Sequence, residues 1–140
     1  MRKMMTGVGV LLLAGLVVGQ EEREITVESM PPVVVKTVPQ AGDMEVDPGL
    51  KEIQATFSKE MKTERMWAWC QVSAEHFPKS AGAVHYLGDK RTCVKPVELE
   101  AGKTYCVWLN LGKFDSFRDA GNRPAVPYLL VFKTKDKAGK

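Results

Sequence analysis

Cysteines and histidines are the first residues in this sequence to consider as metal ligands. Cys70, Cys93 and Cys106 contain no C-x-x-C spacing, and only His76 and His85 could join them. Structural zinc sites usually draw four ligands from paired motifs, so we expect no metal site and interpret the thiols as small hydrophobic groups. The odd count implies a free thiol or an intermolecular bridge. A disulfide bridge from Cys70 to Cys106 would need their strands to be adjacent and in register. We expect all three thiols to stay reduced without loss of the fold.

No arrangement of residues typical of catalysis is recognisable. Nucleophilic catalysis needs a Ser, Cys or Thr beside a base and an orienting group, and no G-x-S-x-G or comparable elbow occurs. Asp115, Asp119 and Asn122 lack the alternating acidic ligands and closing Glu of an EF-hand. We interpret them as a solvated turn. The sequence therefore predicts no catalytic residue and no cofactor.

The candidate binding residues are Trp67, Trp69 and Trp108. Trp67 and Trp69 are two positions apart, so in an extended strand they share a face. Tyr105 and Val107 have the parity of core residues, which places Trp108 on the outer face of its strand. An exposed aromatic surface suits a sugar ring or a partner protein. The alternative is that Trp67, Trp69 or both fill the core, as a tryptophan does in antibody-type domains.

Length and composition indicate one globular domain behind a leader. The chain has 140 residues, of which 44% are hydrophobic and 26% charged, close to the globular average. Arg2 and Lys3 precede an apolar run at 8–18 that is too short to span a membrane, which predicts a signal peptide over residues 1–19 and an exported protein. The alternative is an uncleaved anchor. Without the two leader cations the net charge is +1, so electrostatic capture of nucleic acid is not expected.

The rest of the chain divides into three parts. Residues 20–32 are acidic, end in two prolines and are predicted to be a linker. Residues 33–134 alternate β-rich segments with turn signals and predict an all-β, two-sheet β-sandwich of about seven strands. Residues 135–140 are a lysine-rich tail. Pro96 predicts a bulge or a sheet edge. The expected strands are 33–38, 50–57, 66–72, 83–87, 92–99, 104–110 and 128–134.

Two groups of motifs, one in each half of the chain, match a known pattern. The first group lies at 36–42, 46–48 and 53–61, and the second at 99–105, 119–122 and 132–134. Together they resemble bacterial Ig-like domains of the SbsA type over roughly residues 31–135. The resemblance implies an Ig-like sandwich without catalytic activity that serves as a spacer or binding module in exported proteins. We therefore expect a binding or structural module at the cell envelope, with a protein or glycan as partner.

A second resemblance provides the alternative function. The proline-glycine turn and the Phe-Ser followed by an acidic residue at 57–60 are similar to periplasmic copper carriers of the CopC type. That family binds copper with a histidine at the mature amino terminus, where this chain has Gln20, Glu21 and Glu22. The methionines of this chain could bind Cu(I) as soft ligands but are not clustered in the sequence. The alternative is a copper-binding protein, and we expect no stoichiometric copper binding.

Overall fold

The computed structural model describes residues 24–137. The chain divides into two compact units between Met30 and Pro31. The described end of the first unit is a turn in which the Ser29 and Met30 N–H groups donate to the Thr26 carbonyl. The predicted signal peptide lies outside the described residues. Within 24–137, no helix has the length and apolar character that crossing a membrane requires.

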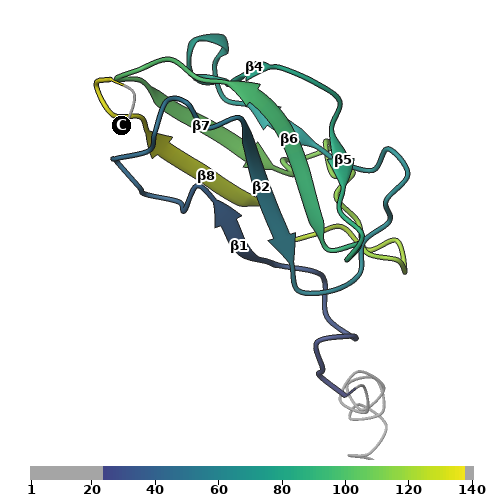
Figure 1. Cartoon of the computed structure of the whole chain (residues 1–140). Coiled ribbons are helices and arrows are strands. Elements are labelled where there is room, and N and C mark those ends of the chain that lie inside the picture. The colour runs from purple at the N-terminus through teal and green to yellow at the C-terminus, as the bar shows by residue number, and fades with distance from the viewer. Residues whose placement is uncertain (1–23, 138–140) are drawn as a thin grey trace, which may run out of the picture. The chain divides into compact units, whose positions relative to one another are not determined.

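The second unit is built from two antiparallel sheets. Five strands form one sheet in the order β1-β2-β6-β4, with β5 also paired to β6, and three form the other in the order β3-β7-β8. Figure 1 shows β7 and β8 side by side, behind β2 and β6. The elements are β1 (Val34–Val38), β2 (Glu52–Phe57), β3 (Trp69–Gln71), η1 (a 3-10 turn, Ala74–His76), β4 (Lys79–Ser80), β5 (His85–Tyr86), β6 (Thr92–Glu98), β7 (Thr104–Leu109) and β8 (Tyr128–Lys133).

This strand order is that of a constant-type immunoglobulin sandwich, with four strand positions in one sheet and three in the other. The β4 and β5 strands share one position, because both pair with β6. The predicted two-sheet Ig-like sandwich is confirmed. Residues 24–137 contain eight strands rather than about seven, because Lys79 and Ser80, which lie outside the expected strands, pair with Glu98 and Val97.

The core lies between the sheets and follows the period-two pattern of the strands. In β2, Ile53, Ala55 and Phe57 are at most 1% exposed and alternate with half-buried polar residues. In β7, Tyr105, Val107 and Leu109 are buried, as predicted, and lie opposite two buried residues and the half-buried Tyr128 of β8. Full burial of side chains of this size contributes about 1.5–3 kcal/mol each.

Tyr105 also fixes the connection between β6 and β7. Its hydroxyl accepts a hydrogen bond from the Glu100 N–H at 2.8 Å, and the Glu100 carbonyl accepts one from the Thr134 hydroxyl at 2.6 Å. A tyrosine at the start of this strand that bonds back to the preceding turn is the tyrosine corner of Ig-like folds. The corner therefore joins the turn before β7 to the end of β8.

Pro96 lies on an inner strand, in a gap between two short pairing strands, and not at the bulge or sheet edge that we expected. On one side β6 pairs continuously with β2, where Pro96 lies opposite Glu52. On its other side, in the gap between β4 and β5, the Pro96 carbonyl accepts a hydrogen bond from the Ala81 N–H. Proline has no N–H to donate to a neighbouring strand, so a gap in the pairing accommodates it. Gly82 passes close by, since a Cβ there would be 3.2 Å from the Pro96 Cβ.

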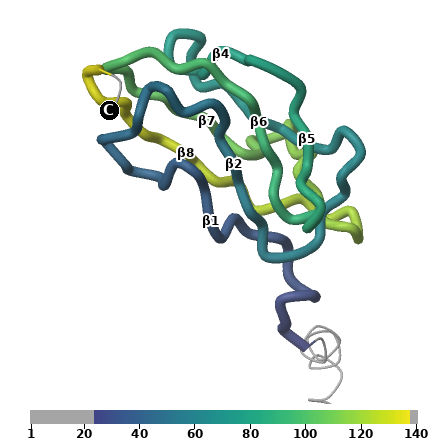
Figure 2. The backbone as a smooth tube through the Cα atoms, in the orientation of Figure 1, coloured from purple at the N-terminus to yellow at the C-terminus, as the bar shows by residue number. Residues whose placement is uncertain are grey.

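The connection between β1 and β2, which are neighbours in one sheet, passes beside the edge strand β8 of the other sheet. The Val38–Pro39 bond is cis, and Gly42 has a φ of +89°, which glycine adopts without strain. The Gly42 N–H then donates to the Val131 carbonyl, and the Val46 N–H to the Lys133 carbonyl. Figure 2 shows this connection running beside the end of β8.

The long connection between β7 and β8 is held by buried polar groups. Asn110 donates to the carbonyls of Phe117 and Ala125 and accepts from the Phe117 N–H, each at 3.0 Å. Asp119 is 1% exposed, and its carboxylate lies 2.7 Å from the Lys59 ammonium. The interpretation of Asp119 as part of a solvated turn is wrong, because Lys59, distant in the sequence, covers it.

Candidate binding surface

Trp69 faces the inside of the sandwich. On β3 it lies opposite Leu109, which is in the core, and directly opposed residues of an antiparallel pair share a face. Its ring meets the Phe117 ring edge-on, with centroids 5.4 Å apart. Its indole nitrogen is buried, and its interaction with the Cys93 thiol acts to lower the pKa of that thiol. Trp69 therefore closes one end of the core and is only half-buried.

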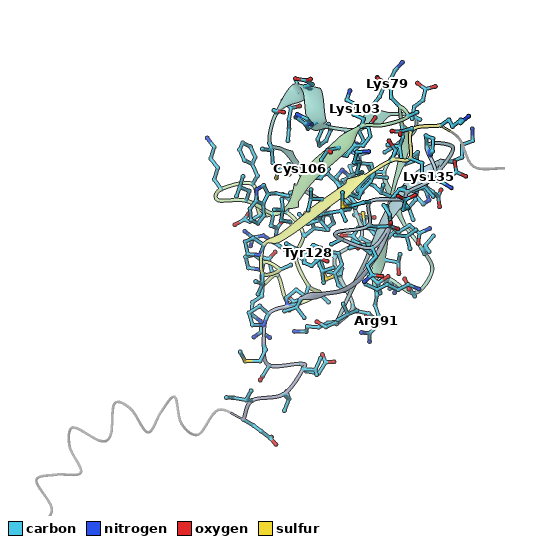
Figure 3. The ribbon with its side chains drawn as sticks, turned by 90° about the vertical axis from the view of Figure 1, so that its left-hand side faces the viewer. Lys79, Arg91, Lys103, Cys106, Tyr128 and Lys135 are labelled. Atoms are coloured by element: carbon cyan, nitrogen blue, oxygen red, sulfur yellow. The ribbon has the colours of Figure 1, made fainter. Side chains whose placement is uncertain are left out.

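Trp108 faces the opposite side of the same sheet. It lies opposite Cys70 on β3 and Leu129 on β8, and Leu129 is 37% exposed. Cys106 has the same parity, and Figure 3 labels it on β7. The register therefore places Cys106 and Trp108 on the face away from the core, where both are half-buried. The register thus places Trp69 and Trp108 on different faces, so these two rings do not form one strip.

Trp67 lies between two surface grooves. One groove, about 480 Å³, we call the Trp69 groove, and the other, about 460 Å³, the Arg65 groove. Both volumes are within the range of small-ligand sites. The Trp69 groove includes Trp67, Trp69, Cys70, Leu111, Lys113 and Phe114. The Arg65 groove includes Thr63, Arg65, Trp67, His85, Tyr86 and Lys90.

The two grooves differ in chemical character. In the Trp69 groove Phe114 is 59% exposed, and the Lys113 ammonium lies 5.5 Å from the centre of its ring. In the Arg65 groove the Trp67 and Tyr86 rings are 6.3 Å apart, and three basic side chains line the same space. The first groove is therefore mainly aromatic and apolar, and the second combines aromatic walls with positive charge.

Among the predicted site residues, the structure brings Trp67 and Trp69 together along one groove. Trp108 lies beyond that groove on the outer face, connected to it through Cys70, which lines the groove and lies opposite Trp108. Sequence reasoning missed Tyr86 and the cations of the Arg65 groove, because they reach Trp67 only through the fold. The available signal was the alternation of Val84 and Tyr86 in a predicted strand segment.

The three cysteines are free thiols in this structure. Strands β3 and β7 are adjacent, but their register places Cys70 opposite Trp108 and not opposite Cys106. Cys93 is fully buried, and burial raises the pKa of its thiol to about 12 against the opposing influence of Trp69 and neighbouring groups. Burial also raises the pKa of Cys70. Reactivity of a thiol requires its thiolate, so neither group is activated.

The histidines occupy separate segments. His76 Nδ1, in η1, is 2.9 Å from the Thr104 carbonyl oxygen, and His85 Nδ1, in β5, is 3.0 Å from the Ala83 carbonyl oxygen. Across residues 24–137, no three His, Cys, Asp or Glu side chains lie close enough together to hold a metal ion.

The sandwich, its strand order and the tyrosine corner define this molecule as an Ig-like β-sandwich protein. The model of the bacterial Ig-like domain family matches residues 28–134. The chain therefore belongs to the bacterial Ig-like domain family, which confirms the resemblance seen in its motifs.

Two further comparisons complete this result. A search of curated proteins found no match. Among solved structures, the crystal structure of the S-layer protein rSbsC is similar, with 16% sequence identity and a TM-score of 0.48. The alignment covers 77% of this chain and 14% of that protein, so the chain spans only a small part of its length.

Proposed function

We propose that this chain is an exported, non-catalytic Ig-like module that binds a protein or glycan at the cell envelope through the surface around Trp67. Family membership supports a structural or binding module. Export is supported by the leader-like residues 1–19, in which two cations precede an apolar run.

The observation that most supports binding is the position of Trp67. This half-buried ring separates two grooves, and aromatic side chains line both of them. Aromatic groups at a concave surface supply large contact area and a defined geometry to a bound ring or side chain. A pure spacer requires no such surface. Trp108, Cys70 and Leu129 extend the apolar surface onto the outer face of the sheet.

The copper-carrier alternative gains no support from the described residues. His76 and His85 each bond to a backbone carbonyl in a different element. Calorimetry with Cu(I) and Cu(II) tests this alternative directly. We expect no stoichiometric binding, and submicromolar affinity for either ion would favour the copper function.

Fractionation of cells that produce the full chain tests the proposed function. We expect a processed form that begins at Gln20, outside the cytoplasm and retained on washed envelope material. The control carries Leu12→Arg and Leu13→Arg, which interrupt the apolar run that a signal peptide needs, so that chain should remain unprocessed in the cytoplasm. An unprocessed cytoplasmic form of the unaltered chain would contradict the proposal.

A further inference from the structure

The Arg65 groove contains positive charge that forms no ion pair with an acidic side chain of residues 24–137. Arg65, His85 and Lys90 line it, and neither Arg65 nor Lys90 forms an ion pair with a described residue. Asp89 is next to Lys90 in the chain, but its carboxylate accepts backbone N–H groups of its own turn. The charges of this groove are therefore free to meet an external anion.

Another groove shows the contrasting case. It lies at the end of the molecule where Figure 3 labels Lys79 and Lys103, and it has a volume of about 370 Å³. Here each lysine faces an acid, with Lys79 3.2 Å from Glu98 and Lys103 3.7 Å from Glu100. Because its charges are internally paired, this groove is not a candidate anion site.

The aromatic walls of the Arg65 groove are held in place by the fold. Trp67 and Tyr86 are both half-buried, and their rings are tilted by 43° to each other. The Tyr86 hydroxyl donates to the Met66 carbonyl at 2.6 Å. This bond links β5 to the segment that carries Trp67, so the two walls are fixed relative to each other. A preformed site loses less entropy when a ligand binds.

The backbone at both cations is unusual. Arg65 and Lys90 each have a φ of +59°, whereas the other two non-glycine residues with positive φ in the described chain are Asn110 and Asn122. Asparagine takes this conformation readily, but long side chains rarely do. Residues held in such conformations tend to occur at ligand sites. Their presence in the lining of one groove is a second observation that favours binding there.

We infer that the Arg65 groove binds an acidic saccharide, with a sugar ring against Trp67 or Tyr86 and a carboxylate or phosphate between Arg65 and Lys90. A guanidinium group presents paired donors that fit either anion, and aromatic rings suit the apolar face of a sugar. The groove volume of about 460 Å³ lies in the range of small-ligand sites. The inference rests on the proposed function, because it names the ligand class of the same surface.

Titration of the processed chain, followed by tryptophan fluorescence and calorimetry, tests the inference. The acidic probe is tetragalacturonate, and its methyl ester is the matched probe with the same rings and no charge. We expect the acid to bind about tenfold more tightly at low salt, as one charge-assisted interaction would give. Mannose 6-phosphate compared with mannose tests phosphate as the source of the charge. Equal binding within both pairs would overturn the inference, and so would tighter binding of oligothymidylate than of either acid.

Variants of the two cations locate the site. Arg65→Asn and Lys90→Asn remove the charge while asparagine tolerates the positive φ, so we expect each to weaken acid binding about tenfold with an unchanged unfolding midpoint. The control is Lys51→Asn, an exposed lysine outside the described grooves, and it should bind like the unaltered chain. Unchanged acid binding by both groove variants would contradict the inference.

The outcomes separate this inference from the proposed function. Retention on envelope material without a preference for acidic sugars would overturn the ligand class alone. A cytoplasmic, unprocessed chain would overturn the proposed function, whatever the titration shows.

Discussion

At the scale of single residues, two buried charges face each other where the β7–β8 connection meets the segment after β2. The Lys59 and Asp119 side chains are 5% and 2% exposed, and 2.7 Å separates Lys59 Nζ from Asp119 Oδ2. Burial acts to raise the pKa of Asp119, but hydrogen bonds and charges from Lys59 and Arg123 outweigh it, so this pKa lies below its ordinary value. The attraction between these two charges offsets the free-energy cost of burying them.

Replacement of one partner should therefore be costly. We expect Asp119→Asn to lower the free energy of unfolding by about 3–5 kcal/mol, because it leaves the Lys59 charge buried without its carboxylate. The matched control is Asp115→Asn, which breaks a partly exposed pair with Arg118 and should cost at most about 1 kcal/mol. Urea unfolding followed by tryptophan fluorescence measures both. Equal costs for the two variants would show that Lys59 does not need Asp119.

The same carboxylate predicts a loss of stability in acid. A group whose folded pKa is lowered stabilises the fold above its unfolded pKa of about 3.9 and loses that contribution as the pH falls through the folded value. We expect the free energy of unfolding of the unaltered chain to fall as the pH drops below about 5. The Asp119→Asn profile should be flatter there, and parallel profiles for the two proteins would contradict the assignment.

The cysteines make a third residue-scale prediction. Cys93 is fully buried, whereas Cys70 and Cys106 are half-buried, and burial raises the pKa of Cys93 to about 12. Because alkylation requires an accessible thiolate, iodoacetamide at pH 8 should modify Cys93 only after unfolding and the other two first. Peptide mass spectrometry gives each rate, and all three thiols should react in urea. Rapid modification of Cys93 in the folded chain, or fewer than three free thiols, would contradict this.

At the scale of elements, Asn110 holds the long connection between β7 and β8. It is 1% exposed, has a φ of +65°, and makes three hydrogen bonds to the backbone of Phe117 and Ala125. We expect Asn110→Ala to cost about 3 kcal/mol or more, since it leaves several buried backbone groups unpaired. Asn122→Ala is the control, because Asn122 also has positive φ but is exposed. Chemical denaturation measures the free energy of unfolding of both variants. Similar losses for the two would show that the cost comes from alanine at a positive φ and not from the lost hydrogen bonds.

The sequence predicted the long strands better than the short ones. Alternation in β2 and β7 identified the core-facing residues because each face meets one environment along its whole length. Residues 66–72 are predicted as a strand, yet β3 covers only Trp69–Gln71, and the Met66 carbonyl bonds to the Tyr86 hydroxyl instead. The two residues of β4 pair only because β6 lies beside them. Elements of this length are set by tertiary contacts, which local patterns do not contain.

At the scale of the whole molecule, the fold was predictable and the candidate site was predictable only in part. Turn signals and motifs indicated the Ig-like sandwich, because they recur in a fixed order along the chain. The Arg65 groove beside Trp67 depends on Arg65 and on the β5–β6 hairpin, which come together only after folding. The separation of Trp69 from Trp108 follows from the register of β3 and β7, which no property of either segment alone determines.

Sedimentation of purified, processed chain with washed envelope material tests binding through the surface around Trp67 most directly. We predict that the unaltered chain sediments with this material and that Trp67→Ala reduces its retention about tenfold, since Trp67 lines both grooves. The unfolding midpoint of Trp67→Ala must lie above the assay temperature, and Arg65→Asn, an exposed position, supplies a second variant that should weaken retention. Retention of both folded variants equal to that of the unaltered chain would contradict binding through this surface.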